Sequence, residues 1–461
     1  MEKLGIQEFI NSSGARISKG YANGVIGGVS TDSRTIKRND LFFALKGPNY
    51  DGHKFIGTAF KKGACGVVVE KKVIDRTYNG KPILAVKSVL DSLHRFAHFY
   101  RKRFKVKVIG ITGSCGKTIV KDMTAVILSS KYNVLATKGN YNNLIGLPLT
   151  IFNIDKNTEV VVLEMGTNHM GEIKRLAEIS EPQIGVIINI GRAHLEFFGN
   201  LENVLKAKME LINALPSNGV AILNCDDPYL QSIIKKRRGK RTITFGFGSD
   251  SEVSGYGINQ TKTELKFSLK ILDRRTAISF KGLGRHLVSD ALAACSVGHL
   301  FEIPLNQMSA TLRNFKLPPG RVQLKRYRKG YIVDDSYNAN PNSTRAVVEL
   351  LWELFPDDRK VIILGDMLEL GKKGEVLHKE VGRFIGSGKG VILFTIGREA
   401  SAIAEGAKLE GMDSDSVYEF IDKKRAMEKL KHILRPKDVI LVKGSHALHL
   451  EEVTNEIMKW K

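Results

Sequence analysis

Between residues 105 and 224, short apolar runs alternate with segments of helical periodicity. The apolar runs are VKVIGIT, NVLAT, EVVVLEM, IGVIINI and VAILN, and expected helices begin at Lys117 and near residue 170. This alternation is typical of a parallel sheet with helices on both faces. Residues 251–281 change to polar/apolar alternation, which predicts an antiparallel flap, and a helix is expected over 286–300. We therefore predict a central α/β domain over residues 105–317.

Two further domains are expected on either side of the central one. The strand–helix alternation returns after LPPGR at 317–321, which predicts a doubly wound, Rossmann-like domain over residues 318–461. It has no GxGxxG at its first turn, so a dinucleotide is not indicated. Residues 1–104 contain short apolar runs between Gly, Asp and Lys turns and predict a small mixed α/β domain that ends in a helix over 89–103. A chain of 461 residues accommodates three domains.

Composition narrows the class of protein. Apolar residues make up 43% and charged residues 26% of the chain, as in globular proteins. No apolar run is long enough for a membrane-spanning helix, and MEKLGIQEFI lacks the features of a secretory signal, so a cytoplasmic protein is expected. The four cysteines are far apart, which argues against a zinc site or a disulfide framework.

The net charge of +23 would attract polyanions, including nucleic acid, acidic lipids and nucleotides. Its densest cluster has no aromatic residues placed to stack on bases, and we interpret it as a solvated turn. Nucleic acid is therefore not an expected partner, although a basic nucleotide- or nucleic-acid-binding protein without catalysis is the alternative from another class. The cluster consists of Lys235, Lys236, Arg237, Arg238, Lys240 and Arg241.

The sequence GITGSCGKT at 110–118 lies between an expected strand and an expected helix, as a phosphate-binding loop requires. Glycines allow backbone N–H groups to converge on phosphate oxygens, and the helix N-terminus adds positive potential. Lys117 would neutralise the β- and γ-phosphates, and the Thr118 hydroxyl would reach Mg²⁺. The strict GxxxxGK spacing would need glycine where Ile111 stands, so the loop has the variant form TGxxGKT. The expected nucleotide contacts are Thr112, Gly113, Ser114, Cys115, Gly116, Lys117 and Thr118.

This loop and a series of later strings together resemble the Mur ligase family. The strings are TKGNYNNLIGLP at 137–148, EMGTNHMGEI at 164–173, NIGRAHLEFFG at 189–199, KAKME at 206–210, DDSYNANPNS at 334–343, LGDMLELG at 364–371 and VKGSHALHLEEV at 442–453. They span all three expected domains in order. STDSRTIKRNDLFFALKG and DGHKFI, at 30–56, are similar to the nucleotide-sugar-binding domain of the family.

Within the family, the strings look most like the type that joins D-Ala-D-Ala to UDP-MurNAc-tripeptide. The resemblance implies an ATP-dependent amide ligation by way of an acyl phosphate, in the cytoplasmic synthesis of peptidoglycan precursors. It implies small-molecule partners and a monomer. A different Mur ligase and a folylpolyglutamate-synthase-like ligase are the alternatives within this chemistry.

The resemblance also implies roles for individual residues. Lys117, His194 and Lys208 would be catalytic, and Thr118, Glu164, His194 and Lys208 would surround two Mg²⁺ ions. Lys208 would act as a carbamylated lysine, with Lys206 as the alternative in the same string. Further ATP contacts would be Asp290, Arg321, Asp335 and Asn338. Substrate contacts would be Ser30, Asp32, Ser33, Arg34, Asn140, Asn142, Asn143, Asn168, His169, Tyr337 and Asn340.

One string departs from the pattern of similar ligases. They usually read HNxxNALAA, whereas HLVSDALAA at 286–294 has Leu287 and Asp290 in place of the asparagines. An ionised Asp290 accepts hydrogen bonds but does not donate them, so the departure bears on the recognition of adenine.

Overall fold

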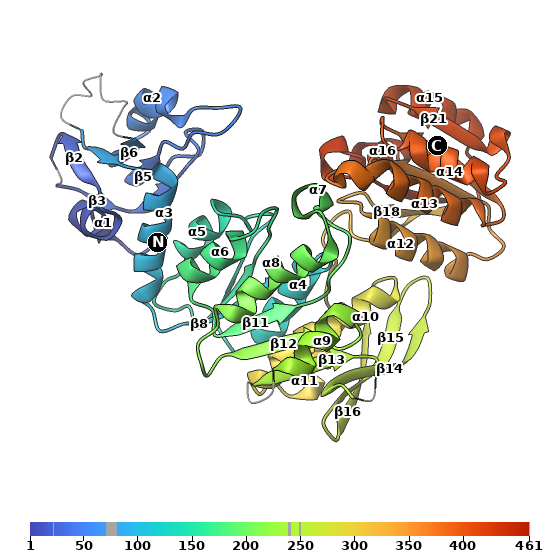
Figure 1. The fold of residues 1–461 in the computed structure, drawn as a ribbon, viewed down its shortest axis with the longest axis horizontal. Helices are drawn as coiled ribbons and strands as arrows, with labels where there is room; N and C mark the ends of the chain where they lie inside the picture. Colours follow the sequence, from blue (N-terminus) through green and yellow to red (C-terminus); the bar gives the residue numbers. More distant parts are fainter. Residues whose placement is uncertain (22, 71–80, 238–240, 249, 461) are drawn as a thin grey trace.

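The computed structural model describes residues 1–21, 23–70, 81–237, 241–248 and 250–460, which form three parts in chain order (Figure 1). The N-terminal part is blue, the central part is mostly green and yellow, and the C-terminal part is orange and red. Among the described residues, no strand pairs with another across residue 104 or residue 317. Each sheet therefore lies within one of the three parts.

The N-terminal part is a mixed sheet covered by helices. Its five-stranded sheet has the order β2 (Arg16–Lys19), β7 (Ile83–Val86), β6 (Gly66–Glu70), β5 (Asp40–Phe43) and β4 (Gly28–Ser30). A small second sheet pairs β1 (Leu4–Gly5) with β3 (Val25–Ile26). The helices are α1 (Ile6–Ser13), η1 (Gly52–Phe55), α2 (Ile56–Lys61) and α3 (Val89–Lys102).

Helix α3 joins the N-terminal part to the central one. The Ser88 side chain caps the helix by accepting from the Asp91 N–H. Its Tyr100 ring is fully buried, and the Tyr100 hydroxyl donates to the Ile154 carbonyl at 2.6 Å. This helix forms as predicted, and it ends one residue earlier than expected.

The central part is one nine-stranded sheet. Its order is β16 (Arg274–Phe280), β15 (Leu265–Ile271), β14 (Val253–Gln260), β13 (Thr242–Gly246), β12 (Val220–Asn224), β11 (Ile184–Ile187), β8 (Lys107–Thr112), β10 (Val160–Glu164) and β9 (Val134–Ala136). All pairs from β9 to β14 are parallel, and β15 and β16 are antiparallel additions. The expected flap over 251–281 is therefore an extension of the central sheet, because β14 pairs with β13.

Helices cover both faces of this sheet, as predicted. Neighbouring residues on one strand belong to different apolar clusters. Val108 and Val161 lie in one cluster, whereas the next residues, Ile109 and Val162, lie in the other. Burial on both faces explains why the parallel strands are continuous apolar runs. The helices are α4 (Lys117–Leu128), α5 (Gly146–Ile151), α6 (Glu172–Ser180), α7 (Leu195–Phe198), α8 (Leu201–Asn213), α9 (Pro228–Lys236), α10 (Arg285–Leu300) and α11 (Leu305–Arg313).

The C-terminal part is a six-stranded, mainly parallel sheet. Its order is β17 (Gln323–Tyr327), β18 (Gly330–Asp335), β22 (Val439–Lys443), β19 (Lys360–Gly365), β20 (Val391–Ile396) and β21 (Val417–Phe420), with only β17 antiparallel. Its helical segments are α12 (Pro341–Leu354), η2 (Gly371–Lys373), α13 (Gly374–Gly386), α14 (Ser401–Leu409), η3 (Ser414–Ser416), α15 (Lys423–Ile433), η4 (His446–Leu448) and α16 (Glu451–Ile457).

The helix expected from Ser343 begins earlier, at Pro341. The reason is local, because the Asn340 side chain accepts from the Ser343 N–H at 2.9 Å and caps the helix, and proline is favoured at the first helical position. The helix expected from Arg398 begins at Ser401. The sequence pattern did not single out β17, β21 or α15.

The described part of the densest basic cluster lies at and just beyond the end of α9. Lys235 and Lys236 form the last turn of this helix, and the Arg237 guanidinium donates to the Thr242 hydroxyl at 3.3 Å. Arg238 and Lys240 lie outside the described residues. None of the helices in the described parts of the chain combines the length and the apolar character that a membrane span needs.

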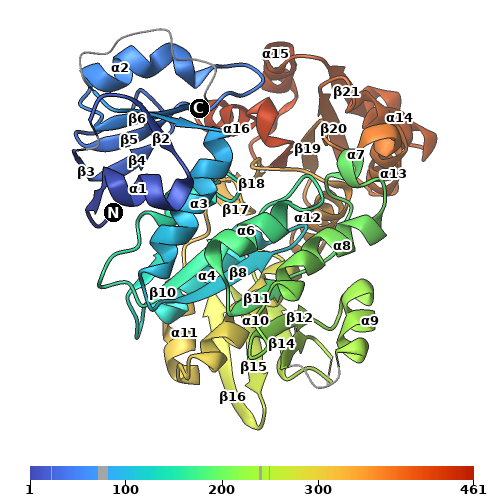
Figure 2. The ribbon, with the colours of Figure 1, turned by 60° about the vertical axis from the view of Figure 1, so that its left-hand side comes forward.

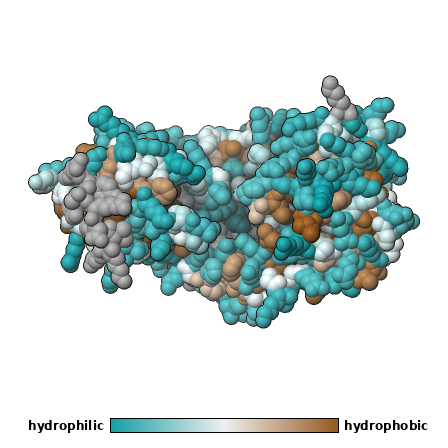
Figure 3. All heavy atoms as spheres, turned by 90° about the horizontal axis from the view of Figure 1, so that it is seen from above, coloured by the Kyte–Doolittle hydropathy of each residue, from teal (hydrophilic) through white to brown (hydrophobic). Residues whose placement is uncertain are grey.

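Two of the contacts between the central and C-terminal parts involve helix α7 and the β14–β15 hairpin. Helix α7 extends from the central part to the C-terminal part (Figures 1 and 2) and contacts η2. The tip of the β14–β15 hairpin forms the second contact, where the Lys262 ammonium lies 4.5 Å from the Phe355 ring centre and 4.0 Å from the Asp358 carboxylate. From above, the surface is hollowed between the N-terminal part on the left and the C-terminal part on the right (Figure 3).

Candidate functional site

The phosphate loop follows β8 and leads directly into α4. Gly116 adopts a φ of +83°, a conformation that favours glycine, and the helix begins at the next residue. The Ser114 hydroxyl donates to the Gly191 carbonyl at 3.1 Å, and the Cys115 N–H donates to the Asn189 side chain at 2.9 Å. The loop is thus tied to the segment after β11. Its backbone can bind an anion at the N-terminus of α4.

Two lysines lie in and beneath this loop. The Lys117 ammonium donates to the Gly113 carbonyl at 2.8 Å. Desolvation lowers the pKa of Lys117, and the nearby Glu164 opposes that effect. Lys208, on α8, is buried, and burial together with the charge of Lys117 lowers its pKa to about 7. An amine with this pKa is substantially neutral near pH 7 and can react as a nucleophile.

Glu164 has the properties of a metal ligand. It ends β10, is 2% exposed, and accepts from the Asn142 amide through Oε1 at 2.8 Å. Its Oε2 atom is buried and has no hydrogen-bond partner among the residues that the structure describes. A buried carboxylate oxygen without a partner is costly, and a cation would satisfy it. The donor set therefore fits Mg²⁺, which prefers oxygen ligands.

His194 lies between the central and C-terminal parts. It caps α7 with a φ of +55°, and its Nδ1 lies 2.5 Å from Oε2 of Glu369, on the loop after β19. The hydrogen bond to His194 lowers the pKa of Glu369. Within the described ranges, no group of three or more His, Cys, Asp or Glu side chains is positioned to hold a metal. A metal here would thus depend on Glu164, His194 and other donors.

The C-terminal part supplies cations and amides. The Arg321 guanidinium lies 3.9 Å from the Tyr337 ring centre and 3.4 Å from the Thr118 hydroxyl of the phosphate loop. The buried Lys443 ammonium pairs with Asp335 at 2.5 Å and donates to the Asn338 carbonyl at 2.9 Å. These contacts fix the loop after β18 against the end of β22.

Most of the predicted site residues line a single cavity of about 920 Å³, between the carboxyl edges of the central and C-terminal sheets. Ligands of parallel α/β sheets usually bind at this edge. The predicted residues that line the cavity are Ser114, Cys115, Gly116, Lys117, Thr118, Asn140, Asn142, Asn143, Glu164, Asn168, His194, Asp290, Arg321, Asp335, Tyr337, Asn338 and Asn340.

A few predicted residues do not line the cavity. Thr112 and Gly113 lie at the base of the loop, where the Thr112 hydroxyl donates to the Met165 carbonyl at 2.8 Å. Lys208 lies beneath the lining, close enough to Lys117 for their charges to interact. His169 is exposed and packs its ring 4.7 Å from that of Phe197.

The predicted sugar-nucleotide residues form a turn after β4 in the N-terminal part. Ser30 is buried, whereas the Asp32 carboxylate accepts from the Arg34 N–H at 2.8 Å and pairs with its guanidinium at 2.7 Å. The hydrogen bond from Arg34 lowers the pKa of Asp32. Ser33 belongs to the same turn. These four residues are absent from the lining of the cavity.

Asp290 lies against the phosphate loop. Its carboxyl is 3% exposed, and a Cβ atom added to Gly116 would lie 2.3 Å from its Oδ1. Burial raises the pKa of Asp290 well above its usual value, and Arg321 offsets only part of this effect. A protonated carboxyl both donates and accepts, as an amide does. In its protonated form, Asp290 would keep both hydrogen-bonding roles of the asparagine that it replaces.

The cavity also contains residues that the sequence reasoning missed. They include Asn189, Asp227, His286, Asn342, Lys443 and His446. Lys443 and His446 belong to the string VKGSHALHLEEV, which carried the resemblance but was given no site residue. Their position at the end of a parallel strand was the signal available.

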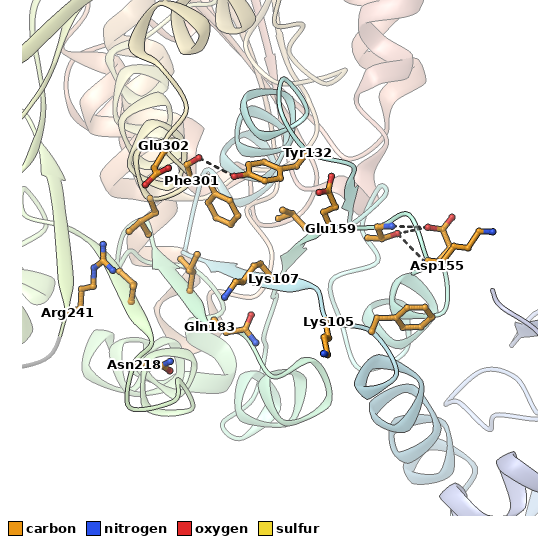
Figure 4. A pocket seen from close by; sticks show the side chains of 17 residues that line it. Lys105, Lys107, Tyr132, Asp155, Glu159, Gln183, Asn218, Arg241, Phe301 and Glu302 are labelled. Carbon is orange, nitrogen blue, oxygen red and sulfur yellow. Dashed lines mark hydrogen bonds between the residues drawn. The ribbon is translucent and has the colours of Figure 1, made fainter.

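A second hollow, of about 790 Å³, lies at the opposite edge of the central sheet (Figure 4). Its lining includes side chains from the amino ends of the strands, among them Lys105, Lys107, Tyr132, Gln183 and Arg241. The Gln183 side chain is already hydrogen-bonded to the backbone, because its oxygen accepts from the Val108 N–H at 2.8 Å. This edge is remote from the phosphate loop.

Family models match all three parts of the chain. Residues 25–101 match the Mur ligase family catalytic domain, residues 111–298 match the Mur ligase middle domain, and residues 320–446 match the Mur ligase glutamate ligase domain.

Individual proteins are similar over nearly the whole length. UDP-N-acetylmuramoyl-tripeptide–D-alanyl-D-alanine ligase of Bacillus subtilis strain 168 is 37% identical over 440 residues, which cover 95% of this chain and 94% of that protein. A crystal structure of MurF from Acinetobacter baumannii superposes with a TM-score of 0.91 at 28% identity and covers 100% of both chains. MurF ligase of Thermotoga maritima in complex with ADP has a TM-score of 0.82 at 28% identity and covers 94% of this chain and 97% of that one.

Proposed function

The chain belongs to the Mur ligase family, and from this premise we infer that it is the ATP-dependent ligase that joins D-Ala-D-Ala to UDP-MurNAc-tripeptide in peptidoglycan precursor synthesis. The observation that carries this inference is the similarity at 37% identity over 95% of the chain to a relative with that activity in its name. For the alternatives, another Mur ligase and a folylpolyglutamate-synthase-like enzyme, similar solved structures are only 17% and 14% identical and show a shared fold alone.

The cavity suits the two chemical steps of such a ligation. A carboxylate oxygen of the tripeptide attacks the γ-phosphorus of ATP, ADP departs, and an acyl phosphate forms. The amine of D-Ala-D-Ala then attacks the acyl carbon, the C–O bond to phosphate breaks, and the amine loses a proton. Because the first step brings two anions together, it needs preorganised positive charge. Lys117 and Arg321 supply that charge from the two sides of the cavity.

We propose that Thr118, Glu164, His194 and Lys208 surround two Mg²⁺ ions. Support comes from the unpartnered Glu164 Oε2 atom and from the position of His194 on the same cavity. Bound Mg²⁺ would neutralise charge on the phosphates. Lys208, with a pKa of about 7, has the neutral amine that carbamylation by CO₂ requires, and the carbamate would add a second anion to that of Glu164.

Each domain has a proposed role. Residues 1–104 would bind UDP-MurNAc through Ser30, Asp32, Ser33 and Arg34, residues 105–317 would bind ATP, and residues 318–461 would bind the acceptor side. Asn140, Asn143, Asn168, His169, Tyr337 and Asn340 would contact substrate. Asp290, Asp335 and Asn338 would contact ATP. We further propose that the protein acts as a monomer in the cytoplasm, where ATP and UDP-linked precursors are available.

The test is phosphate release from ATP in the presence of Mg²⁺, UDP-MurNAc-tripeptide and D-Ala-D-Ala, with each component omitted in turn. Tripeptides with diaminopimelate and with lysine at the third position are compared. We expect release only in the complete mixture with at least one of them. Equal release without D-Ala-D-Ala, or none with either tripeptide from protein that binds ATP, would contradict the proposed function.

A further inference from the structure

The LELG string, residues 368–371, lies where the C-terminal part contacts the central part. It forms the loop between β19 and η2, and its Glu369 carboxylate crosses to the central part to reach Nδ1 of His194 at 2.5 Å. The backbone joins the same contact, because the Glu196 N–H donates to the Glu369 carbonyl at 3.0 Å. A Cβ atom added to Gly371 would lie 2.8 Å from the Glu196 Cα atom. The two loops therefore meet in one defined register.

Both residues of this contact have unusual backbones. His194 has a φ of +55° and Glu369 has a φ of +64°, a region that residues other than glycine seldom occupy. Such conformations persist where the surroundings impose them, and they concentrate at functional sites. Two facing residues with the same conformation indicate that both loops are shaped for this contact.

Each loop is also held from behind. The Leu368 N–H donates to the Ser445 hydroxyl at 2.9 Å, which anchors the Glu369 loop in the C-terminal part. On the other side, the Gly191 N–H donates to the Ser114 hydroxyl at 2.8 Å, which ties the segment before His194 to the phosphate loop. Hydrogen bonds and the short stretches of backbone between them thus connect the phosphate loop through His194 to the C-terminal sheet.

The hydrogen bond also determines which nitrogen of His194 is available. An ionised carboxylate only accepts, so the Nδ1 atom carries the proton and donates it to Glu369. In a neutral imidazole the Nε2 atom then keeps its lone pair, and the His194 side chain lines the cavity. In metal sites, a carboxylate behind a histidine fixes the tautomer and the ring orientation in this way.

We propose that Glu369 is a positioning residue for the metal site, and that it makes the ligand geometry of His194 depend on the docking of the C-terminal part. The proposal rests on the proposed function, because it assumes that His194 binds the metal. Docking of the C-terminal part would then complete both the ATP site, through Arg321, and the metal site, through Glu369.

The chain offers a matched control at the same junction. Arg192, two residues before His194, pairs with Glu380 of the C-terminal part at 2.8 Å, and Glu380 does not line the cavity. Glu380→Gln removes a carboxylate contact between the same two parts and leaves the imidazole of His194 untouched. It therefore separates loss of docking strength from loss of histidine orientation.

The experiment measures Mn²⁺ affinity by calorimetry and by electron paramagnetic resonance, in the full-length protein with ADP. We expect Glu369→Gln to weaken Mn²⁺ binding by about 10- to 100-fold. Glu380→Gln should stay within about twofold of the wild type, as for most surface substitutions. His194→Gln should lose at least as much affinity as Glu369→Gln. Circular dichroism and thermal unfolding identify any variant that fails to fold.

A double-mutant cycle gives the decisive comparison. If Glu369 acts through His194, the double variant His194→Gln/Glu369→Gln should bind Mn²⁺ no more weakly than His194→Gln alone. Additive losses, or wild-type affinity in folded Glu369→Gln, would overturn the positioning role while leaving the metal assignment intact. Wild-type affinity in His194→Gln would overturn both the assignment and the inference that depends on it.

Discussion

The side-chain amide of Asn340, in the C-terminal part, donates a hydrogen bond of 3.1 Å to the thiol of Cys115 in the phosphate loop. The contact joins residues 225 positions apart in the chain, one from each side of the cavity. A group attached to this thiol would therefore enter the space proposed for ATP and would also separate the two parts.

Alkylation of Cys115 should abolish ATP binding. The thiol is partly exposed, whereas Cys295 is fully buried and burial raises its pKa to about 12, so its thiolate is scarce. We expect iodoacetamide to inactivate the wild type, ATP to protect it, and Cys115→Ser to remain active and resistant. Titration of ATP binding before and after labelling provides the measurement. Cys225→Ser is the control and should stay sensitive to iodoacetamide. Inactivation of Cys115→Ser at the wild-type rate would contradict the assignment of Cys115 to the ATP site.

Lys117→Ala should lower ATP turnover by at least about 100-fold, since it removes one preorganised cation at the developing charge. The fold should survive, because the hydrogen bond of the ammonium within the described residues is a local one, to the Gly113 carbonyl of its own loop. Steady-state phosphate release measures turnover, and thermal unfolding tests the fold. The control is Lys131→Ala, an exposed lysine just beyond α4, which should behave as wild type. Wild-type turnover in Lys117→Ala would refute the phosphate site.

The role proposed for Lys208 predicts a dependence on CO₂. With a pKa of about 7, the neutral amine that reacts with CO₂ falls about tenfold between pH 8 and pH 6. In CO₂-depleted buffer, activity should therefore decline more at pH 6 than at pH 8, and bicarbonate should restore it. Lys208→Ala should be inactive, whereas Lys206→Ala, at an exposed position, should respond to bicarbonate as the wild type does. Full activity of Lys208→Ala would rule out the role.

Asp290→Asn should stabilise the protein at alkaline pH. Because the folded-state pKa of Asp290 is raised, its contribution to stability is complete below the unfolded pKa of about 3.9 and is lost as the pH rises through the folded pKa. Asparagine does not titrate, so the melting temperature of the variant should exceed that of the wild type by more at pH 8 than at pH 5. A constant difference across this range, measured by calorimetry without nucleotide, would show that Asp290 does not titrate with folding.

The sequence predicted the parts of the fold that depend on local patterns. Buried parallel strands such as β10 are continuous apolar runs, and Glu164 at its end could be placed at the carboxyl edge of the sheet. The flap interpretation of residues 251–281 missed the pairing of β14 with β13, because alternation reveals one buried face but not the neighbouring strand.

Contacts between the parts were beyond the reach of sequence patterns. The pairing of His194 with Glu369 joins residues 175 positions apart, and nothing in either string specifies the other. The low pKa of Lys208 likewise arises from burial beneath the phosphate loop, whereas Lys206, two positions away, is exposed. Periodicity placed both lysines on one helix, but only tertiary packing distinguishes them.

The most direct test of the ligase assignment follows oxygen atoms from substrate to product. UDP-MurNAc-tripeptide labelled with oxygen-18 in its terminal carboxylate is incubated with ATP, Mg²⁺, D-Ala-D-Ala and the protein. The masses of the products are then measured by mass spectrometry. The ligase assignment predicts UDP-MurNAc-pentapeptide together with inorganic phosphate that carries one labelled oxygen. Unlabelled phosphate, or ADP formed without pentapeptide, would contradict it.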